Sequence, residues 1–198
     1  MFLLIYEGHI RIKNNGKDYS CVIEEEITHD LSDGVENFLE SDKAPAWVQK
    51  FSIQCERPIS PHGKVGRSMP RLDIRIRSGE APFPKFVFEA KRLRHNTRPA
   101  DYFGSDGIER FWNGTGYPVN LFNEAGMIGY VQNRDTVHWN NWLKERFEKR
   151  RDALHASKGS DWESAIQVTE LSDTFCTRHQ PDANEEPIVI FHLLLLFC

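Results

Sequence analysis

The segments Arg71-Leu-Asp-Ile-Arg-Ile-Arg77 and Phe86-Val-Phe-Glu-Ala-Lys91 decide the fold of this 198-residue chain. In the first segment apolar and charged residues alternate, as in a strand with one buried and one polar face. The second is an apolar run that ends in charged residues, which is typical of a buried strand. A turn over 79–84 separates them, so we expect the two strands to pair as a hairpin.

Outside this hairpin the sequence predicts further strands and helices in alternation. Strands are expected in the opening segment around Ile10 and Ile12, and at 51–56, 127–131, 165–171 and 187–197. Helices are expected at 23–39, 99–112 and 137–154, and the Pro-, Gly- and Ser-rich stretch 58–70 is expected to be a loop. This order predicts an α/β fold with a mixed central β-sheet flanked by helices. The length suits a single domain over 1–198.

Three residues in these strands could bind a metal ion or take part in catalysis, namely Asp73, Glu89 and Lys91. Residues two apart in a strand share a face, so Glu89 and Lys91 point the same way, and a hairpin can bring Asp73 beside them. Two carboxylates on adjacent strands suit Mg²⁺, and a neighbouring ammonium group can orient or deprotonate a water and stabilise a phosphate transition state. The simpler alternative is a solvated ion pair at a strand end, which stabilises a protein by only about 0–1 kcal/mol.

The pattern Pro70-Arg-Leu-Asp73 followed by Glu89-Ala-Lys91 resembles the signature of the PD-(D/E)xK, or restriction-endonuclease-like, nuclease superfamily. Proline and aspartate are not adjacent here, because Arg71 and Leu72 intervene. The resemblance implies a restriction-endonuclease-like core over about 20–135, followed by a C-terminal helix and strands over 136–198. It implies that Asp73, Glu89 and the carbonyl of Ala90 bind Mg²⁺, for which Mn²⁺ can substitute, and that Lys91 is the catalytic lysine.

Members of this superfamily often add a glutamate from the first helix to the site. Glu24 is the preferred candidate, because it falls on the same helical face as Ile27 and Leu31. Glu25 and Glu36 are the alternatives. An ordinary exposed helix residue is the simpler explanation for any of the three.

A cluster of basic residues follows the motif directly. Arg92, Arg94, His95 and Arg98 are candidates for a phosphate clamp beside the scissile bond, or else form a solvated loop. Because the helix after the lysine strand commonly lines the substrate groove in the superfamily, Tyr102 and Arg110 are added as nucleic-acid-binding candidates. The charged stretch 144–151 mixes Lys and Arg with Glu, which favours a solvated face over a DNA-binding stripe.

Composition limits the classes of protein to which this chain can belong. With a formal net charge of −4 it cannot bind nucleic acid through bulk charge, so any such contact needs a local basic patch, a metal site or a partner. The four cysteines show no C-x-x-C spacing and fit a reducing compartment. The apolar ends, 1–6 and 188–197, are too short for a membrane span of roughly 20 residues, and the first lacks signal-peptide features. We expect a cytoplasmic protein without a membrane partner.

The leading hypothesis is therefore a Mg²⁺-dependent endonuclease that hydrolyses DNA phosphodiester bonds. The resemblance favours a cleavage module in prokaryotic defence, restriction or repair, working as a homodimer or within a larger assembly. The sequence does not distinguish DNA from RNA. A catalytically inactive nuclease-fold binding or scaffold subunit is the second hypothesis, and a metal-dependent phosphoesterase with a small-molecule substrate is the third.

Overall fold

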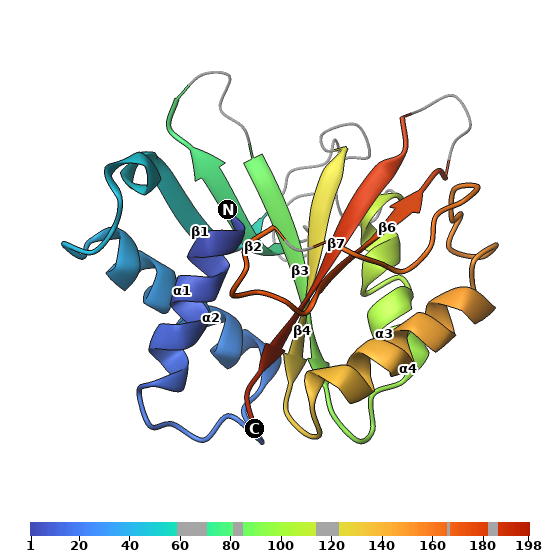
Figure 1. Ribbon diagram of the computed structural model, residues 1–198, viewed down its shortest axis with the longest axis horizontal. Coiled ribbons are helices and arrows are strands. Elements are labelled where there is room, and N and C mark those ends of the chain that lie inside the picture. Colours follow the sequence, from blue (N-terminus) through green and yellow to red (C-terminus); the bar gives the residue numbers. More distant parts are fainter. Residues whose placement is uncertain (59–70, 81–84, 114–122, 166, 182–185) are drawn as a thin grey trace.

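The computed structural model describes residues 1–58, 71–80, 85–113, 123–165, 167–181 and 186–198. In these residues a seven-stranded mixed sheet lies between two layers of helices (Figure 1). The predicted α/β class with a mixed central sheet flanked by helices is thus confirmed. Apart from Pro58, the predicted loop at 58–70 lies outside the described residues.

The strand order in the sheet is β1-β2-β3-β4-β7-β6-β5. The antiparallel meander of β1 (Phe51–Pro58), β2 (Arg71–Ser78) and β3 (Lys85–Leu93) forms one half. In the centre, β4 (Glu124–Val131) runs parallel to both β3 and β7 (Ile188–Leu196). The other edge is antiparallel and consists of β6 (Thr174–His179) and β5 (Glu163–Ser164).

Each face of the sheet has its own apolar core. Helices α1 (Phe2–Lys13) and α2 (Glu24–Leu39) cover one face, while α3 (Pro99–Phe103) and α4 (Thr136–Lys149) cover the other (Figure 1). The alternation of β4 divides its side chains between the cores, with Ile128 and Tyr130 toward the first and Met127 and Val131 toward the second. None of the helices in the described residues has the length and apolar character needed to cross a membrane.

The opening segment is a helix, so the prediction of a strand around Ile10 and Ile12 was wrong. Its buried residues recur at helical spacing, with Leu4, Ile5, Gly8 and Ile12 on one side of α1. That side packs closely on α2. A Cβ atom placed on Gly34 would lie 2.7 Å from the carbonyl oxygen of Gly8, so the two backbones meet where neither has a side chain.

Two predicted helices end earlier than expected. Instead of a helix over 99–112, α3 stops at Phe103 and a 3-10 turn, η3 (Ile108–Phe111), follows. The glycines between them explain the break, since a Cβ atom on Gly107 would lie 2.1 Å from the carbonyl oxygen of Tyr102. Helix α4 ends at Lys149 rather than at 154, and the chain then turns so that Leu154 is buried in the second core.

The strand predicted over 165–171 is absent from the described residues of that stretch. Its apolar residues Ala165, Val168 and Leu171 lie three apart, so they could not share one side of a strand. All three pack on the first core, and the Leu171 amide donates to the Val168 carbonyl at 2.9 Å, which marks a turn. The sheet hydrogen bonds are made instead by β5 and β6 on either side of this stretch.

A relay of four hydrogen bonds runs through the second core. It joins the Tyr102 hydroxyl to His192 Nδ1 at 3.1 Å, His192 Nε2 to Thr177 Oγ1 at 2.9 Å, and Thr177 Oγ1 to His179 Nε2 at 2.7 Å. His179 Nδ1 reaches the Leu154 carbonyl at 2.8 Å. Because a carbonyl oxygen only accepts, His179 Nδ1 must donate to it, and His179 Nε2 then accepts from Thr177 Oγ1. By the same reasoning His192 Nε2 donates to Thr177 Oγ1, and the Tyr102 hydroxyl donates to His192 Nδ1.

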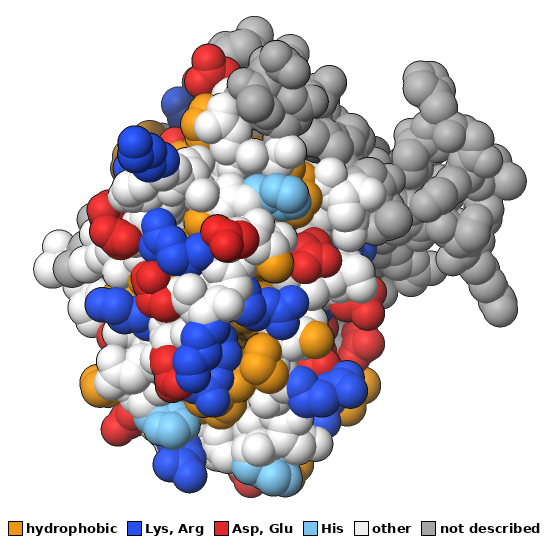
Figure 2. Space-filling model, turned by 90° about the vertical axis from the view of Figure 1, so that its right-hand side faces the viewer, with side chains coloured by type: hydrophobic (Ala, Val, Ile, Leu, Met, Phe, Trp, Pro, Cys, Tyr) orange, Lys and Arg blue, Asp and Glu red, His pale blue; other side chains and the backbone are white. Residues whose placement is uncertain are grey.

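The outer face of α4 carries charges of both signs. Figure 2 shows Lys and Arg interspersed with Asp and Glu across this side of the molecule. Glu145 pairs with Arg146 at 2.5 Å and with Lys149 at 2.6 Å, and Glu148 pairs with Arg151 at 3.3 Å. This arrangement fits the solvated face predicted for 144–151, because the pairing leaves no continuous basic stripe along these residues.

Candidate active site

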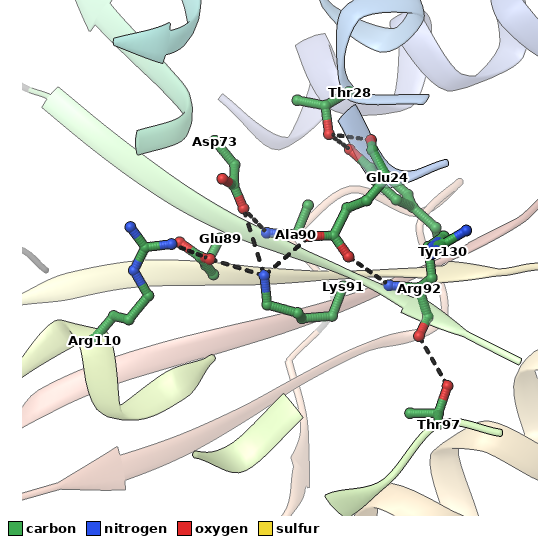
Figure 3. A network of polar contacts seen from close by, with 10 residues as sticks. All are labelled: Glu24, Thr28, Asp73, Glu89, Ala90, Lys91, Arg92, Thr97, Arg110 and Tyr130. Atoms are coloured by element: carbon green, nitrogen blue, oxygen red, sulfur yellow. Dashed lines mark hydrogen bonds and ion pairs between the residues drawn. The ribbon is translucent and has the colours of Figure 1, made fainter. Parts of the chain in front are cut away.

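The pairing of β2 with β3 brings Asp73 to the motif Glu89-Ala90-Lys91. Ile74 pairs with Phe88, so the same antiparallel register carried one residue further sets Asp73 opposite Glu89. Asp73 Oδ2 accepts a hydrogen bond from the Ala90 amide at 2.8 Å and lies 3.9 Å from Lys91 Nζ (Figure 3). The sheet therefore collects all three motif side chains at one place, as the sequence predicted.

Lys91 lies at the centre of the acidic groups. Its Nζ donates to Glu89 Oε1 at 2.9 Å and to Glu24 Oε1 at 3.0 Å. The Glu89 side chain is completely buried, and the Lys91 side chain keeps 13% of its surface exposed. One ammonium group thus contacts three carboxylates from β2, β3 and α2.

Glu24 is the first residue of α2, and its carboxylate reaches two neighbouring residues of β3. Besides the bond from Lys91, its Oε2 accepts from the Arg92 backbone amide at 3.0 Å. Thr28, one turn later, is hydrogen-bonded at 3.0 Å to the Tyr130 hydroxyl, which ties α2 to β4. The alternatives Glu25 and Glu36 are exposed on α2, so Glu24 is the glutamate of this helix that the structure brings to the site.

Arg110 joins the same cluster from η3, a contact that sequence reasoning missed. Its Nη1 donates to Glu89 Oε1 at 2.5 Å, so Glu89 receives two cations on one oxygen. The sequence suggested Arg110 as a contact for nucleic acid, whereas in the structure it pairs with a carboxylate of the motif. No local pattern around Arg110 indicates this partner, because the contact depends on how η3 packs against β3.

The close packing of these groups moves their pKa values. Burial, followed by the nearby charge of Glu89, raises the pKa of Asp73 to about 7. The pKa of Glu24 is also raised by burial, which the Lys91 charge opposes. Burial acts to lower the pKa of Lys91, but Glu89 and Glu24 outweigh it and raise that pKa, so Lys91 holds its proton. The ammonium group is therefore suited to donate hydrogen bonds rather than to act as a base.

Asp73 and Glu89 are the side chains best placed to hold a divalent cation. Both carboxylates contact Lys91 Nζ, and burial together with the Glu89 charge raises the pKa of Asp73, which favours a proton on that carboxyl group. Oxygen ligands of this kind suit Mg²⁺. Among the described residues, no group of three or more His, Cys, Asp and Glu side chains has a metal-binding arrangement.

A pocket of about 440 Å³ opens beside Lys91 and Glu24. The turn that follows β3 contributes residues to the pocket lining. Thr97 holds this turn together, since its Oγ1 accepts from the Arg94 amide at 2.9 Å and donates to the Arg92 carbonyl at 3.0 Å. Arg98 pairs with Asp101 at 2.8 Å. The lining is mostly basic or polar and consists of Glu24, Lys91, Arg92, Arg94, Asn96, Thr97, Arg98 and Asp101.

Three of the predicted basic contacts therefore line this pocket, namely Arg92, Arg94 and Arg98. His95 is exposed next to the pocket and is not part of its lining. The prediction that Tyr102 contacts nucleic acid was wrong. Its ring is completely buried in the second core, where its hydroxyl bonds to His192.

Comparisons with known proteins leave the function to be argued from this site alone. No protein-family model matches the chain, and no curated protein or solved structure is significantly similar to it.

Proposed function

We propose that this chain is a metal-dependent nuclease whose active site consists of Asp73, Glu89, Lys91 and Glu24. The observation that carries the proposal is the meeting of the Asp73 and Glu89 carboxyl groups beside a protonated Lys91. A solvated ion pair at a strand end would not account for this arrangement, because Glu89 is completely buried and Lys91 nearly so. Buried charge clusters of this kind are costly to stability and are typical of functional sites.

The order of the elements supports a restriction-endonuclease-like core. Helix α2 precedes the antiparallel meander of β1, β2 and β3, and α3 then leads to β4, which pairs parallel to β3. The motif residues lie on β2 and β3 within this unit, and the first-helix glutamate lies at the start of α2. The family resemblance implies a helix-strand-strand-helix-strand core with the motif on its strands. Elements α2, β2, β3, α3 and β4 follow that order, and β1 is an additional strand.

The residues have separate tasks in phosphodiester hydrolysis. Asp73, Glu89 and the Ala90 carbonyl would hold Mg²⁺, which supplies charge to acidify a water molecule and to screen the phosphate. Lys91 donates hydrogen bonds to the phosphate oxygens as negative charge develops on them. Glu24 holds the Lys91 ammonium and the Arg92 amide in place, so it is a positioning residue.

The pocket beside Lys91 favours a nucleic-acid substrate. Its arginines could bind phosphates that flank the scissile bond, which would compensate for the acidic balance of the whole chain. DNA is the substrate we favour, and a role in prokaryotic defence, restriction or repair follows from the family resemblance. We further propose that this protein works as a homodimer or within a larger assembly.

The proposal is tested by incubating wild type and Lys91→Ala with plasmid, linear and single-stranded DNA and with RNA, each with Mg²⁺, Mn²⁺ or EDTA. We expect cleavage by the wild type only, and only with a metal ion. Equal cleavage by both proteins would show that the site is wrong. Hydrolysis of bis(p-nitrophenyl) phosphate without cleavage of any nucleic acid would favour a phosphoesterase with a small substrate.

A non-catalytic binding subunit is the second candidate, and one observation favours it. Glu89 is already neutralised by Lys91 and Arg110, so its charge is satisfied without a metal ion. A protein of this kind would bind DNA equally well in EDTA and in Mg²⁺, would cleave no substrate, and would keep its affinity when Asp73 is replaced by Ala.

A further inference from the structure

Arg110 is one of the cations that contact the buried carboxylate of Glu89. Glu89 has no exposed surface, and the ammonium of Lys91 and the guanidinium of Arg110 both bond to its Oε1. A buried carboxylate must be paired, because leaving one uncompensated costs several kcal/mol. Lys91 and Arg110 thus both place positive charge on the oxygen of Glu89 that a divalent ion could also bind.

The two cations are held differently. Lys91 belongs to β3, whose residues 88–93 are paired with β4, and it bonds to Glu24 as well as to Glu89. Arg110 belongs to η3, a four-residue 3-10 turn that follows Gly107, and its side chain keeps 17% of its surface exposed. Of the two, Arg110 can leave Glu89 without disturbing the sheet.

We propose that Arg110 is a built-in counterion that occupies Glu89 in the metal-free protein and gives way when a divalent cation binds. This inference rests on the proposed function, since it concerns the same metal site. A guanidinium at 2.5 Å from Glu89 Oε1 repels an incoming dication, so metal binding and the Arg110 contact compete. Arg110 thereby weakens metal binding and prevents Glu89 from being left unpaired when the metal is absent.

The test measures Mn²⁺ binding by electron paramagnetic resonance and calorimetry without nucleic acid, so it does not depend on cleavage. Arg110→Met removes the charge and keeps much of the side-chain volume, and Arg110→Lys keeps the charge. Arg178→Met is the matched control, because Arg178 of β6 makes an exposed ion pair with Glu163 of β5 at 3.6 Å. We expect Arg110→Met to bind Mn²⁺ about tenfold more tightly than the wild type, while Arg178→Met is unchanged and Arg110→Lys lies closer to the wild type.

Thermal unfolding gives a second readout. In EDTA, Arg110→Met should melt below the wild type, because Glu89 loses a cation that contacts it, and Mn²⁺ should raise its melting temperature by more than it raises that of the wild type. Mn²⁺ affinity of Arg110→Met equal to or weaker than that of the wild type would overturn the counterion role.

A measurement on the wild type covers the case in which Arg110→Met does not fold. Arginine Nε–Hε resonances, with the Arg110 signal assigned from Arg110→Lys, are followed during Mg²⁺ titration. The Arg110 signal should shift with the same dissociation constant as metal binding, and a signal that stays unmoved at saturation would overturn the proposal. Absence of metal binding in the wild type and in every Arg110 variant would instead overturn the proposed function itself, and the counterion role with it.

Discussion

Glu24 accepts a hydrogen bond from Lys91 Nζ at 3.0 Å across 67 positions of the chain. With its other oxygen it accepts from the Arg92 amide, so one carboxylate fixes both the side chain of Lys91 and the backbone that follows it. We expect Glu24→Gln to lower the cleavage rate about 10- to 100-fold, because the ammonium group loses the charge that holds it in place. Single-turnover kinetics in Mg²⁺ measure this effect, and the exposed neighbour Glu25→Gln is the control. Equal rates for the two variants would show that Glu24 is an ordinary surface residue.

Arg94 offers a test of the pocket beside the site. Its guanidinium forms no ion pair with any acid among the residues that the structure describes, unlike that of Arg98, and it lines the pocket. Arg94→Gln should weaken binding of a 20-nucleotide duplex about 3- to 10-fold in Ca²⁺ and reduce the slope of log affinity against log salt by about one. Fluorescence anisotropy at several salt concentrations gives both quantities. Arg178→Gln should change neither, and a slope unaltered by Arg94→Gln would place the nucleic acid elsewhere.

Asp73 makes the stability of the metal-free protein depend on pH. Its folded pKa of about 7 lies above its ordinary value of 3.8, so between these pH values the native state holds a proton that the unfolded chain releases. The contribution of Asp73 to the free energy of unfolding is therefore greatest below pH 4 and is lost as the pH rises toward 7. Above pH 7 this contribution no longer changes with pH. In EDTA, Asp73→Asn should therefore gain stability relative to the wild type by a few kcal/mol between pH 5 and pH 8.

Urea unfolding of both proteins at four pH values checks the Asp73 prediction. Added Mg²⁺ should stabilise the wild type at pH 8 and have less effect on Asp73→Asn, because the amide removes one of the two carboxylates that would hold the metal ion. A stability difference between the two proteins that does not change with pH would contradict the raised pKa.

The contact between Gly8 and Gly34 links the packing of α1 to the site. An alanine in a helix ordinarily stabilises by up to about 1 kcal/mol over glycine. At Gly34 its Cβ would meet the Gly8 carbonyl at 2.7 Å, so Gly34→Ala should instead destabilise by about 1–3 kcal/mol and reduce cleavage by moving α2, which carries Glu24. Denaturant unfolding and cleavage assays measure the two effects. Asp33→Ala, at an exposed neighbouring position, should leave both nearly unchanged, and a stabilised Gly34→Ala would mean that the helices adjust freely.

The strand pattern predicted the centre of the site, because local alternation determines which side chains share a face. Asp73, Glu89 and Lys91 could be brought together from their spacing alone, and Glu24 from the helical face that it shares with Ile27. The α/β class followed from the order of the same elements. The three motif residues and the fold class needed only periodicity and the pairing of two neighbouring strands, whereas the search for a glutamate in the first helix came from the family resemblance.

The rest depended on contacts that local patterns do not contain. The Arg110–Glu89 pair requires the break after Phe103, where two glycines turn the chain into η3. Tyr102 was misassigned because the resemblance placed this helix along a substrate groove, whereas the Tyr102 ring faces the second core. The opening helix was mistaken for a strand because the alternation of Ile10 and Ile12 over a few residues is also compatible with a strand. The contact of Gly8 with Gly34, which fixes this helix on α2, cannot be seen from the local sequence.

The buried histidines of the hydrogen-bond relay from Tyr102 to Leu154 make the protein less stable as the pH falls. Each histidine accepts a hydrogen bond from a buried hydroxyl group, so an imidazolium at either position would deprive Tyr102 or Thr177 of its acceptor. Burial lowers the pKa of His179 to about 4 and that of His192 well below its ordinary value, whereas both protonate near pH 6.5 in the unfolded chain. Acid therefore favours unfolding, by about 1.4 kcal/mol per pH unit below 6.5 for each histidine, which unfolding of Asp73→Asn between pH 7.5 and 5 would measure. His9, whose pKa is also lowered to about 4 by burial, adds to this effect, so imidazoles outside the candidate active site govern how the molecule responds to acid.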